Sequence, residues 1–155
     1  MTDSYEIRVA IPADVDQIID LLPQLADFDV PEKRDPLDLW HGDAEMVREI
    51  FKGAATASFL EVAVDGERVM GVIMVTMSEE MMSHAPSAHL EAIVVHPDAR
   101  GKGLGQTLLD RSETVAKERG AESISLHVFA NNQRARTLYQ SSGFDQELVR
   151  AIKWF

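Results

Sequence analysis

The sequence contains no cysteine among its 155 residues. This absence excludes a disulfide framework, a thiolate metal site and a cysteine nucleophile. No segment approaches the roughly 18 consecutive apolar residues that a membrane-spanning helix needs. The first residues, 1–6, lack a basic start followed by an apolar run, so we expect no signal peptide. Together these absences predict a cytoplasmic protein that does not associate with membranes.

A surplus of basic residues is also missing. The 26 acidic residues outnumber 15 Lys and Arg, which gives a formal net charge of −11. Because nucleic-acid binders normally carry a basic surface, this charge argues against a nucleic-acid partner. A hydrophobic content of 45% is typical of a globular chain. With no linker or fixed-period repeat, the length predicts one domain over residues 1–155.

The order of apolar runs and turn residues predicts a mixed α/β sheet. Apolar runs at 58–64 and 69–77 flank an Asp-Gly turn, which is typical of a β-hairpin. The other expected strands cover residues 5–10, 89–95, 122–128 and 144–154. The expected helices cover residues 12–25, 43–52 with Asp43 as N-cap, the segment from Gly105 to Gly120, and 132–142.

A glycine-rich loop between a predicted strand and a predicted helix carries the strongest chemical signal. Gly101, Gly103 and Gly105 let a ligand approach the backbone closely. The first N–H groups of a helix lack partners and, with the helix dipole, favour a phosphate or pyrophosphate. Arg100 and Lys102 add positive charge. The alternative is a tight strand-to-helix turn without a ligand. The glycine spacing matches neither a Walker loop nor a dinucleotide-binding fingerprint.

Three segments, in order, resemble motifs of the GNAT superfamily of N-acetyltransferases. Arg100-Gly-Lys-Gly-Leu-Gly105 resembles its Arg/Gln-x-x-Gly-x-Gly/Ala motif, and Asn132-Gln-Arg-Ala-Arg-Thr-Leu-Tyr139 resembles its Asn-x-x-Ala-x-x-x-Tyr helix. Gly143-Phe144 is similar to the Gly-Phe that follows. Before residue 55 only the order of elements matches. The resemblance implies a central, mostly antiparallel sheet, splayed between its fourth and fifth strands and flanked by about four helices.

The resemblance implies acetyl-CoA as co-substrate and no metal. Backbone groups of the fourth strand would bind pantetheine, and the amides of the glycine loop would bind the pyrophosphate. Tyr139 would protonate the departing thiolate. The residues implied in binding acetyl-CoA are Ile93, Val94, Val95, Arg100, Gly101, Lys102, Gly103, Leu104, Gly105, Gln106, Asn132 and Tyr139.

Glu91 is the candidate base that takes a proton from the acceptor amine. A carboxylate between Leu90 and Ala92 is costly on a buried strand unless it has a partner or a purpose. Polyamine-acetylating members of the family place a base in a similar Leu-Glu segment. The alternative is that Glu91 points outward into solvent.

The predicted function is therefore transfer of an acetyl group to a primary amine of a small molecule, by direct attack in a ternary complex. The alternatives are a protein or peptide acceptor and a CoA-binding module without turnover. Other residues allow two interpretations each. Trp40 and Phe28 form a substrate wall or anchor a loop, and His127 faces the cleft or is structural. The apolar C-terminal residues 151–155 suggest a contact in a homodimer.

Overall fold

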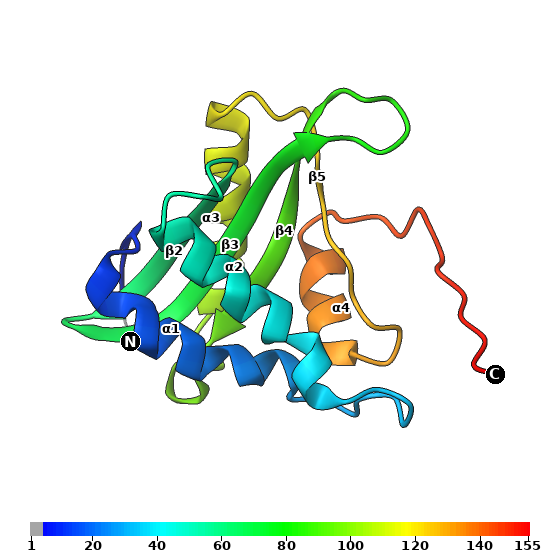
Figure 1. Ribbon diagram of the computed structural model, residues 1–155, viewed down its shortest axis with the longest axis horizontal. Helices are drawn as coiled ribbons and strands as arrows, with labels where there is room; N and C mark the ends of the chain where they lie inside the picture. The colour runs from blue at the N-terminus through cyan, green and yellow to red at the C-terminus, as the bar shows by residue number, and fades with distance from the viewer. Residues whose placement is uncertain (1–4) are drawn as a thin grey trace.

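The computed structural model describes residues 5–155, so part of the segment on which the signal-peptide prediction rests lies outside it. One five-stranded sheet forms the centre of the molecule, with its strands in sequence order (Figure 1). All pairs are antiparallel except the parallel pair of the fourth and fifth strands, which confirms a mostly antiparallel sheet. The strands are β1 (Glu6–Val9), β2 (Ser58–Asp65), β3 (Arg68–Glu79), β4 (Pro86–Val95) and β5 (Ile124–Ser125).

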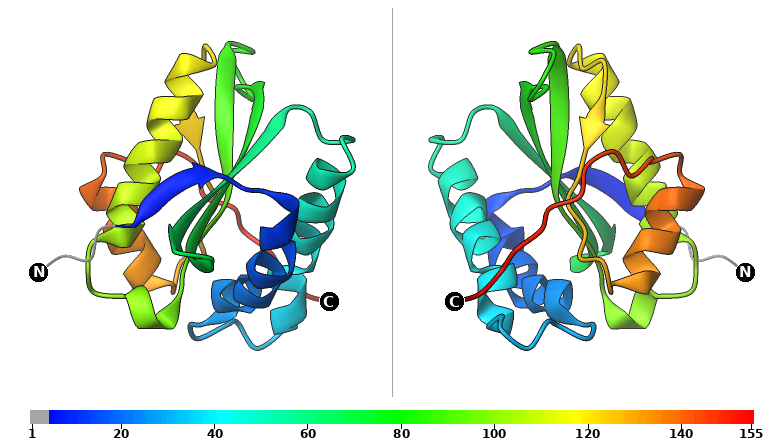
Figure 2. Two further views of the ribbon diagram at one scale, coloured as in Figure 1. Left: turned by 90° about the vertical axis from the view of Figure 1, so that its left-hand side faces the viewer. Right: turned by 90° about the vertical axis from the view of Figure 1, so that its right-hand side faces the viewer.

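Helices cover both faces of this sheet (Figure 2). They are α1 (Val15–Leu21), α2 (His41–Phe51), α3 (Leu104–Glu118) and α4 (Gln133–Ser141). The first two pack on one face and the other two on the opposite face. The prediction that Asp43 caps its helix is wrong. The helix begins at His41 with Trp40 as N-cap, so Asp43 lies in its first turn. None of the helices within residues 5–155 is long and apolar enough to cross a membrane.

The apolar faces of α1, α2 and α3 are buried against the sheet. Ile18 and Leu22 on one side and Leu108 and Leu109 on the other are fully buried. Gly71 in β3 lets α3 come close, because a Cβ there would lie only 2.7 Å from Leu108 Cδ1. This packing fixes the position of the N-terminus of α3 relative to the ends of the strands.

A β-bulge interrupts β4 at Glu91. Leu90 pairs with Val75 and Ala92 pairs with Met74, so Glu91 has no opposite residue in β3. The extra residue reverses the alternation of side chains. Leu90 therefore packs on the face of α3, whereas Ala92 packs on the face of α1 and α2. A bulge of this kind re-aims the side chain that it carries.

The fourth and fifth strands separate just before this bulge. They pair only at Ala88–Ile124 and His89–Ser125. The predicted strand 122–128 is therefore only two residues long, and residues 126–129 run beside β4 without pairing. This separation confirms the predicted splay.

The predicted last strand at 144–154 is wrong. Residues 144–155 form no regular element and leave the body of the molecule as an extended segment (Figure 1). Their apolar pattern is that of a strand, but they do not pair with the outer edge of β5, the end strand of the sheet. The segment makes a cation–π contact between Arg34 and Trp154, at 5.0 Å. Its exposed apolar residues are Leu148, Val149, Ile152, Trp154 and Phe155.

Candidate active site

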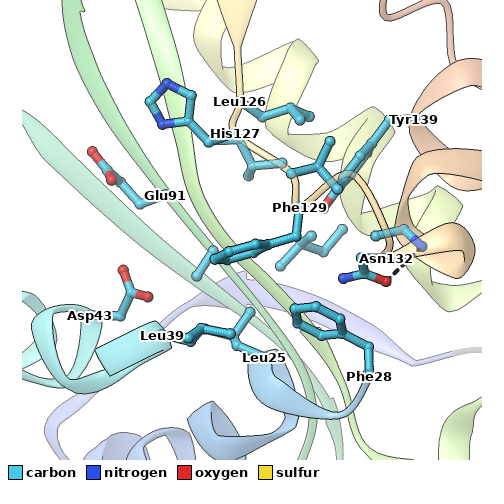
Figure 3. A pocket seen from close by; sticks show the side chains of 15 residues that line it. Leu25, Phe28, Leu39, Asp43, Glu91, Leu126, His127, Phe129, Asn132 and Tyr139 are labelled. Atoms are coloured by element: carbon cyan, nitrogen blue, oxygen red, sulfur yellow. Dashed lines mark hydrogen bonds between the residues drawn. The ribbon is translucent and has the colours of Figure 1, made fainter. Parts of the chain in front are cut away.

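A cleft opens where β4 and the segment after β5 separate. It contains about 580 Å³ of space without protein atoms, part of it open to solvent. Carboxylates and a histidine lie at one end, and an asparagine and a tyrosine at the other (Figure 3). Apolar side chains separate the two ends. The residues that line the cleft are Leu25, Phe28, Leu39, Asp43, Leu90, Glu91, Ala92, Ile93, Leu126, His127, Val128, Phe129, Asn132, Ala135 and Tyr139.

Glu91 and Asp43 form the carboxylate end of the cleft. The bulge in β4 supplies Glu91, and the first turn of α2 supplies Asp43 (Figure 3). Both side chains are half-buried, and within residues 5–155 neither carboxylate has a hydrogen bond or an ion pair. Burial, and secondly the charge of Glu91, raise the pKa of Asp43 to about 7. The two side chains therefore form an uncompensated acidic pair.

Sequence reasoning missed Asp43. Its neighbour Ala44 and the next turn's Val47 lie in the buried stripe of α2. An acidic residue beside a buried stripe is only a weak indication that its side chain faces a cleft. No local sequence pattern distinguishes such a residue from an N-cap.

Two histidines stand next to the acidic pair. The rings of His89 and His127 lie 4.8 Å apart, and His127 lines the cleft. Burial lowers the pKa of His89; the charge of Glu91 opposes this effect and that of His127 adds to it. Because a lowered pKa favours the neutral imidazole at pH 7, His89 does not supply a cation to the acidic pair.

Tyr139 lies at the opposite end of the cleft, on α4. Its ring packs edge-on against Phe144, with the ring centres 6.0 Å apart. Burial raises the pKa of Tyr139 to about 12, so the phenol keeps its proton at neutral pH. A group of this kind can donate a proton but is a poor base.

The glycine loop ends in the N-terminus of α3, outside the set of residues that line the cleft. Gly101 and Gly103 have φ angles of 75° and 81°, a region that glycine adopts without strain. The first helical hydrogen bond runs from the Thr107 N–H to the Gly103 carbonyl, at 3.1 Å. The preceding N–H groups therefore have no partner in the helix and can bind an anion.

Arg100 connects this loop to the segment after α1. Its guanidinium donates hydrogen bonds to Asp27 Oδ2 and Gln24 Oε1, both at 2.8 Å. Arg134 from the first turn of α4 lies 3.8 Å from the same Asp27 carboxylate. These cations hold the pKa of Asp27 below its usual value, mainly through the hydrogen bond from Arg100. Asp27 thus joins three segments that are distant in sequence.

Two other predicted site residues have structural roles as well. Asn132 caps α4, since its Oδ1 accepts a hydrogen bond from the Ala135 N–H at 3.3 Å. Gln106 accepts a hydrogen bond from Ser142 Oγ at 2.9 Å and so connects α3 to α4. Both contacts fix the geometry around the cleft.

The aromatic residues with two interpretations divide between the cleft and the core. Phe28 lines the cleft beside Phe129, with their ring centres 5.5 Å apart. Trp40 packs against the hydrophobic core on the face of α1 and α2. Met70 and Met74 are buried in the core. Within residues 5–155 no group of three or more His, Asp and Glu side chains could hold a metal ion.

Comparison with known proteins identifies one family. The model of the Acetyltransferase (GNAT) family matches residues 18–144. A mycothiol acetyltransferase of Beutenbergia cavernae is 40% identical over 67 residues, which are 43% of this chain and 23% of that protein. An uncharacterized N-acetyltransferase of Bacillus subtilis, YdgE, is 46% identical over 54 residues, which are 35% of this chain and 34% of that protein. The chain thus matches about a third or less of these relatives' length.

Solved structures match nearly the entire chain. A transcriptional regulator from Bacillus halodurans is 27% identical, with a TM-score of 0.76 over 98% of this chain and 100% of that one. The structure of AAC(6')-Iy with the bisubstrate analogue CoA-S-monomethyl-acetylneamine has a TM-score of 0.72 at 20% identity, over 99% of this chain and 98% of that one. At that identity the second likeness concerns the fold alone.

Proposed function

The chain belongs to the GNAT family of acetyltransferases, and from that premise we propose that it transfers the acetyl group of acetyl-CoA to a primary amine of a small molecule. The observation that carries this proposal is the cleft between the separated strands. It has a half-buried carboxylate, Glu91, at one end and a protonated phenol, Tyr139, at the other. Transfer between an amine and a thioester needs a group of each kind.

The chain offers suitable contacts to each part of acetyl-CoA. Beyond His89 the edge of β4 that faces β5 is unpaired, so backbone groups of residues 93–95 can bind the amides of pantetheine as an added strand would. The N–H groups of residues 101–106 can bind the pyrophosphate, and Lys102 adds positive charge. The charge of Arg100, the other predicted contact, is shared with Asp27. Asn132 lies in the cleft, where its side chain can contact the pantetheine arm. Acetyl-CoA supplies the activated acetyl group.

The two polar ends of the cleft account for the proton transfers. Glu91 takes a proton from the acceptor ammonium, directly or through water, so that the neutral nitrogen attacks the acetyl carbonyl carbon. When the carbon–sulfur bond breaks, the Tyr139 hydroxyl gives its proton to the sulfur. The pKa of Tyr139, about 12, is well above the 8.5 of an ordinary thiol, so transfer of its proton to the sulfur is unfavourable by itself. We assign the transfer to a late stage, when negative charge has developed on the sulfur. Solvent then returns a proton to Tyr139 and completes the step. Because the chain has no cysteine, an acetyl-cysteine intermediate cannot form, and we propose that the amine attacks acetyl-CoA directly.

The experiment follows the release of CoA. A thiol reagent reports CoA without background, because the protein has no cysteine of its own. We expect acetyl-CoA to raise Tm and thiol to be released with members of a panel of small primary amines. Turnover only with peptides would favour the protein-acceptor alternative, and binding without turnover would favour the CoA-binding module. Neither binding nor turnover would refute the assignment.

We also propose that two copies associate through residues 144–155. This segment exposes five large apolar side chains, and the outer edge of β5 has no neighbouring strand within residues 5–155. An unpaired edge and an apolar, strand-like segment are complementary. The molar mass in solution tests the proposal. The full chain should have twice its monomer mass, and Val149→Asp, at a side chain that is 93% exposed, should shift it toward the monomer. A monomeric full chain would contradict it.

A further inference from the structure

Two carboxylates lie at one end of the cleft, whereas the proposed proton transfer needs only one. Glu91 alone is sufficient to accept the proton of the attacking amine. Asp43 comes from another element, faces the same space and has no cationic partner within residues 5–155 (Figure 3). Two half-buried carboxylates in one cavity repel each other, and such an arrangement is stable when a ligand supplies positive charge.

We infer that Asp43 is a specificity-determining residue that binds a second cationic group of the acceptor. The inference rests on the proposed function and defines its substrate class more narrowly. The acceptor is a small molecule with at least two amino or similar cationic groups, one that reacts and one that stays charged.

The charge balance during the reaction supports this assignment. The reacting amine loses its proton before attack, and Glu91 holds that proton. An acceptor with one amino group is then neutral, and the charge of Asp43 has no counter-ion. A second ammonium group keeps this carboxylate paired throughout the reaction. Two neighbouring titratable groups do not supply this charge, since Tyr139 is a protonated phenol and burial disfavours the charged form of His89. The remaining titratable group that lines the cleft is His127, whose ring lies 4.8 Å from that of His89.

The rest of the cleft limits the shape of the acceptor. Apolar side chains of Leu25, Phe28, Leu39 and Phe129 lie between its two polar ends. The body of an acceptor that binds at the acidic pair therefore contacts apolar side chains, which favours a carbon chain because a polar one would lose hydrogen bonds to water there.

A pair of acceptors that differ only in the second charge tests the inference. The probes are 1,5-diaminopentane and n-pentylamine, compared by kcat/KM. We expect the protein to prefer the diamine by about tenfold or more, as for a close charge pair in a partly desolvated site. Asp43→Asn should remove most of this preference by lowering kcat/KM for the diamine far more than kcat/KM for pentylamine. The matched control is Glu45→Gln on the same helix, whose exposed carboxylate pairs with His41 at 3.7 Å.

The possible outcomes separate this inference from the proposed function. Equal use of the two amines, or a diamine preference that survives Asp43→Asn, would overturn the inference while leaving the acetyltransferase assignment intact. If acetyl-CoA binds but neither amine is acetylated, the proposed function fails for these amines. Calorimetric binding of 1,5-diaminopentane to the CoA-bound protein then decides the inference. Binding that Asp43→Asn weakens about tenfold supports it, and binding that is absent or unaffected overturns it.

Discussion

Asp43 makes the stability of the protein depend on pH in a way that can be calculated in sign and approximate size. Burial and the charge of Glu91 raise its pKa from 3.8 to about 7. Between these two values the folded state binds more protons than the unfolded state, so this residue's contribution falls as the pH rises and is fully unfavourable above pH 7. Asp43→Asn removes this cost at high pH and changes little at low pH.

The size of the effect follows from the displacement of the pKa. The full displacement corresponds to an upper limit of about 4 kcal/mol. Because the side chain is only half-buried, screening by solvent reduces this to about 1–2 kcal/mol. For a chain of this length the gain in Tm at pH 8 should be about 2–8 °C, with little gain at pH 4.5.

Thermal unfolding at several pH values measures this difference directly. Glu45→Gln is the control, since it removes a carboxylate that is exposed on the same helix. Its Tm should follow that of the unmodified protein at every pH. A gain for Asp43→Asn that does not vary with pH, or a loss of Tm at pH 8, would refute the reasoning from burial and the charge of Glu91.

Three further variants test other parts of the account. Tyr139→Phe should lower kcat about tenfold or more and leave the Kd of acetyl-CoA within about twofold, because it removes only a proton donor; an unchanged kcat would exclude Tyr139 as the acid. Glu91→Gln should reduce the rate most at low pH, where the amine is hardest to deprotonate, and an unaltered pH–rate profile would place the base elsewhere. Gly71→Ala places a Cβ 2.7 Å from Leu108 Cδ1. Denaturant unfolding should show a loss of about 1–3 kcal/mol, and no loss would mean that α3 moves away from β3 freely.

The parts of the fold that depend on neighbouring residues could be predicted from the sequence. The hairpin of β2 and β3 forms around Gly66, whose φ of 62° is the conformation that such a turn needs. The glycine loop ends in α3, and a helix follows at Gln133–Ser141, as local patterns predicted. The side-chain pattern of residues 144–154 also predicted a strand, but the pattern does not reveal whether the segment pairs with an edge of the sheet.

The parts of the site that depend on distant segments could not be predicted. The bulge at Glu91 is a property of the register between β3 and β4, which the sequence of β4 alone does not contain. Asp43 reaches the cleft because α2 packs across the sheet, and Asp27 contacts Arg100 across 73 residues of chain. Local sequence patterns therefore indicate single candidate residues, whereas the proximity of Glu91 to Asp43 follows only from the three-dimensional fold.

Transfer of a labelled acetyl group tests the central claim most directly. Acetyl-CoA with a heavy-isotope acetyl group is incubated with the protein and 1,5-diaminopentane, and mass spectrometry follows the amine, CoA and the protein itself. The account predicts one labelled acetyl group on the amine for each CoA released and no label on the protein. Release of CoA without acetylated amine, or an acetylated protein that passes its label on, would contradict direct transfer in the cleft between β4 and β5.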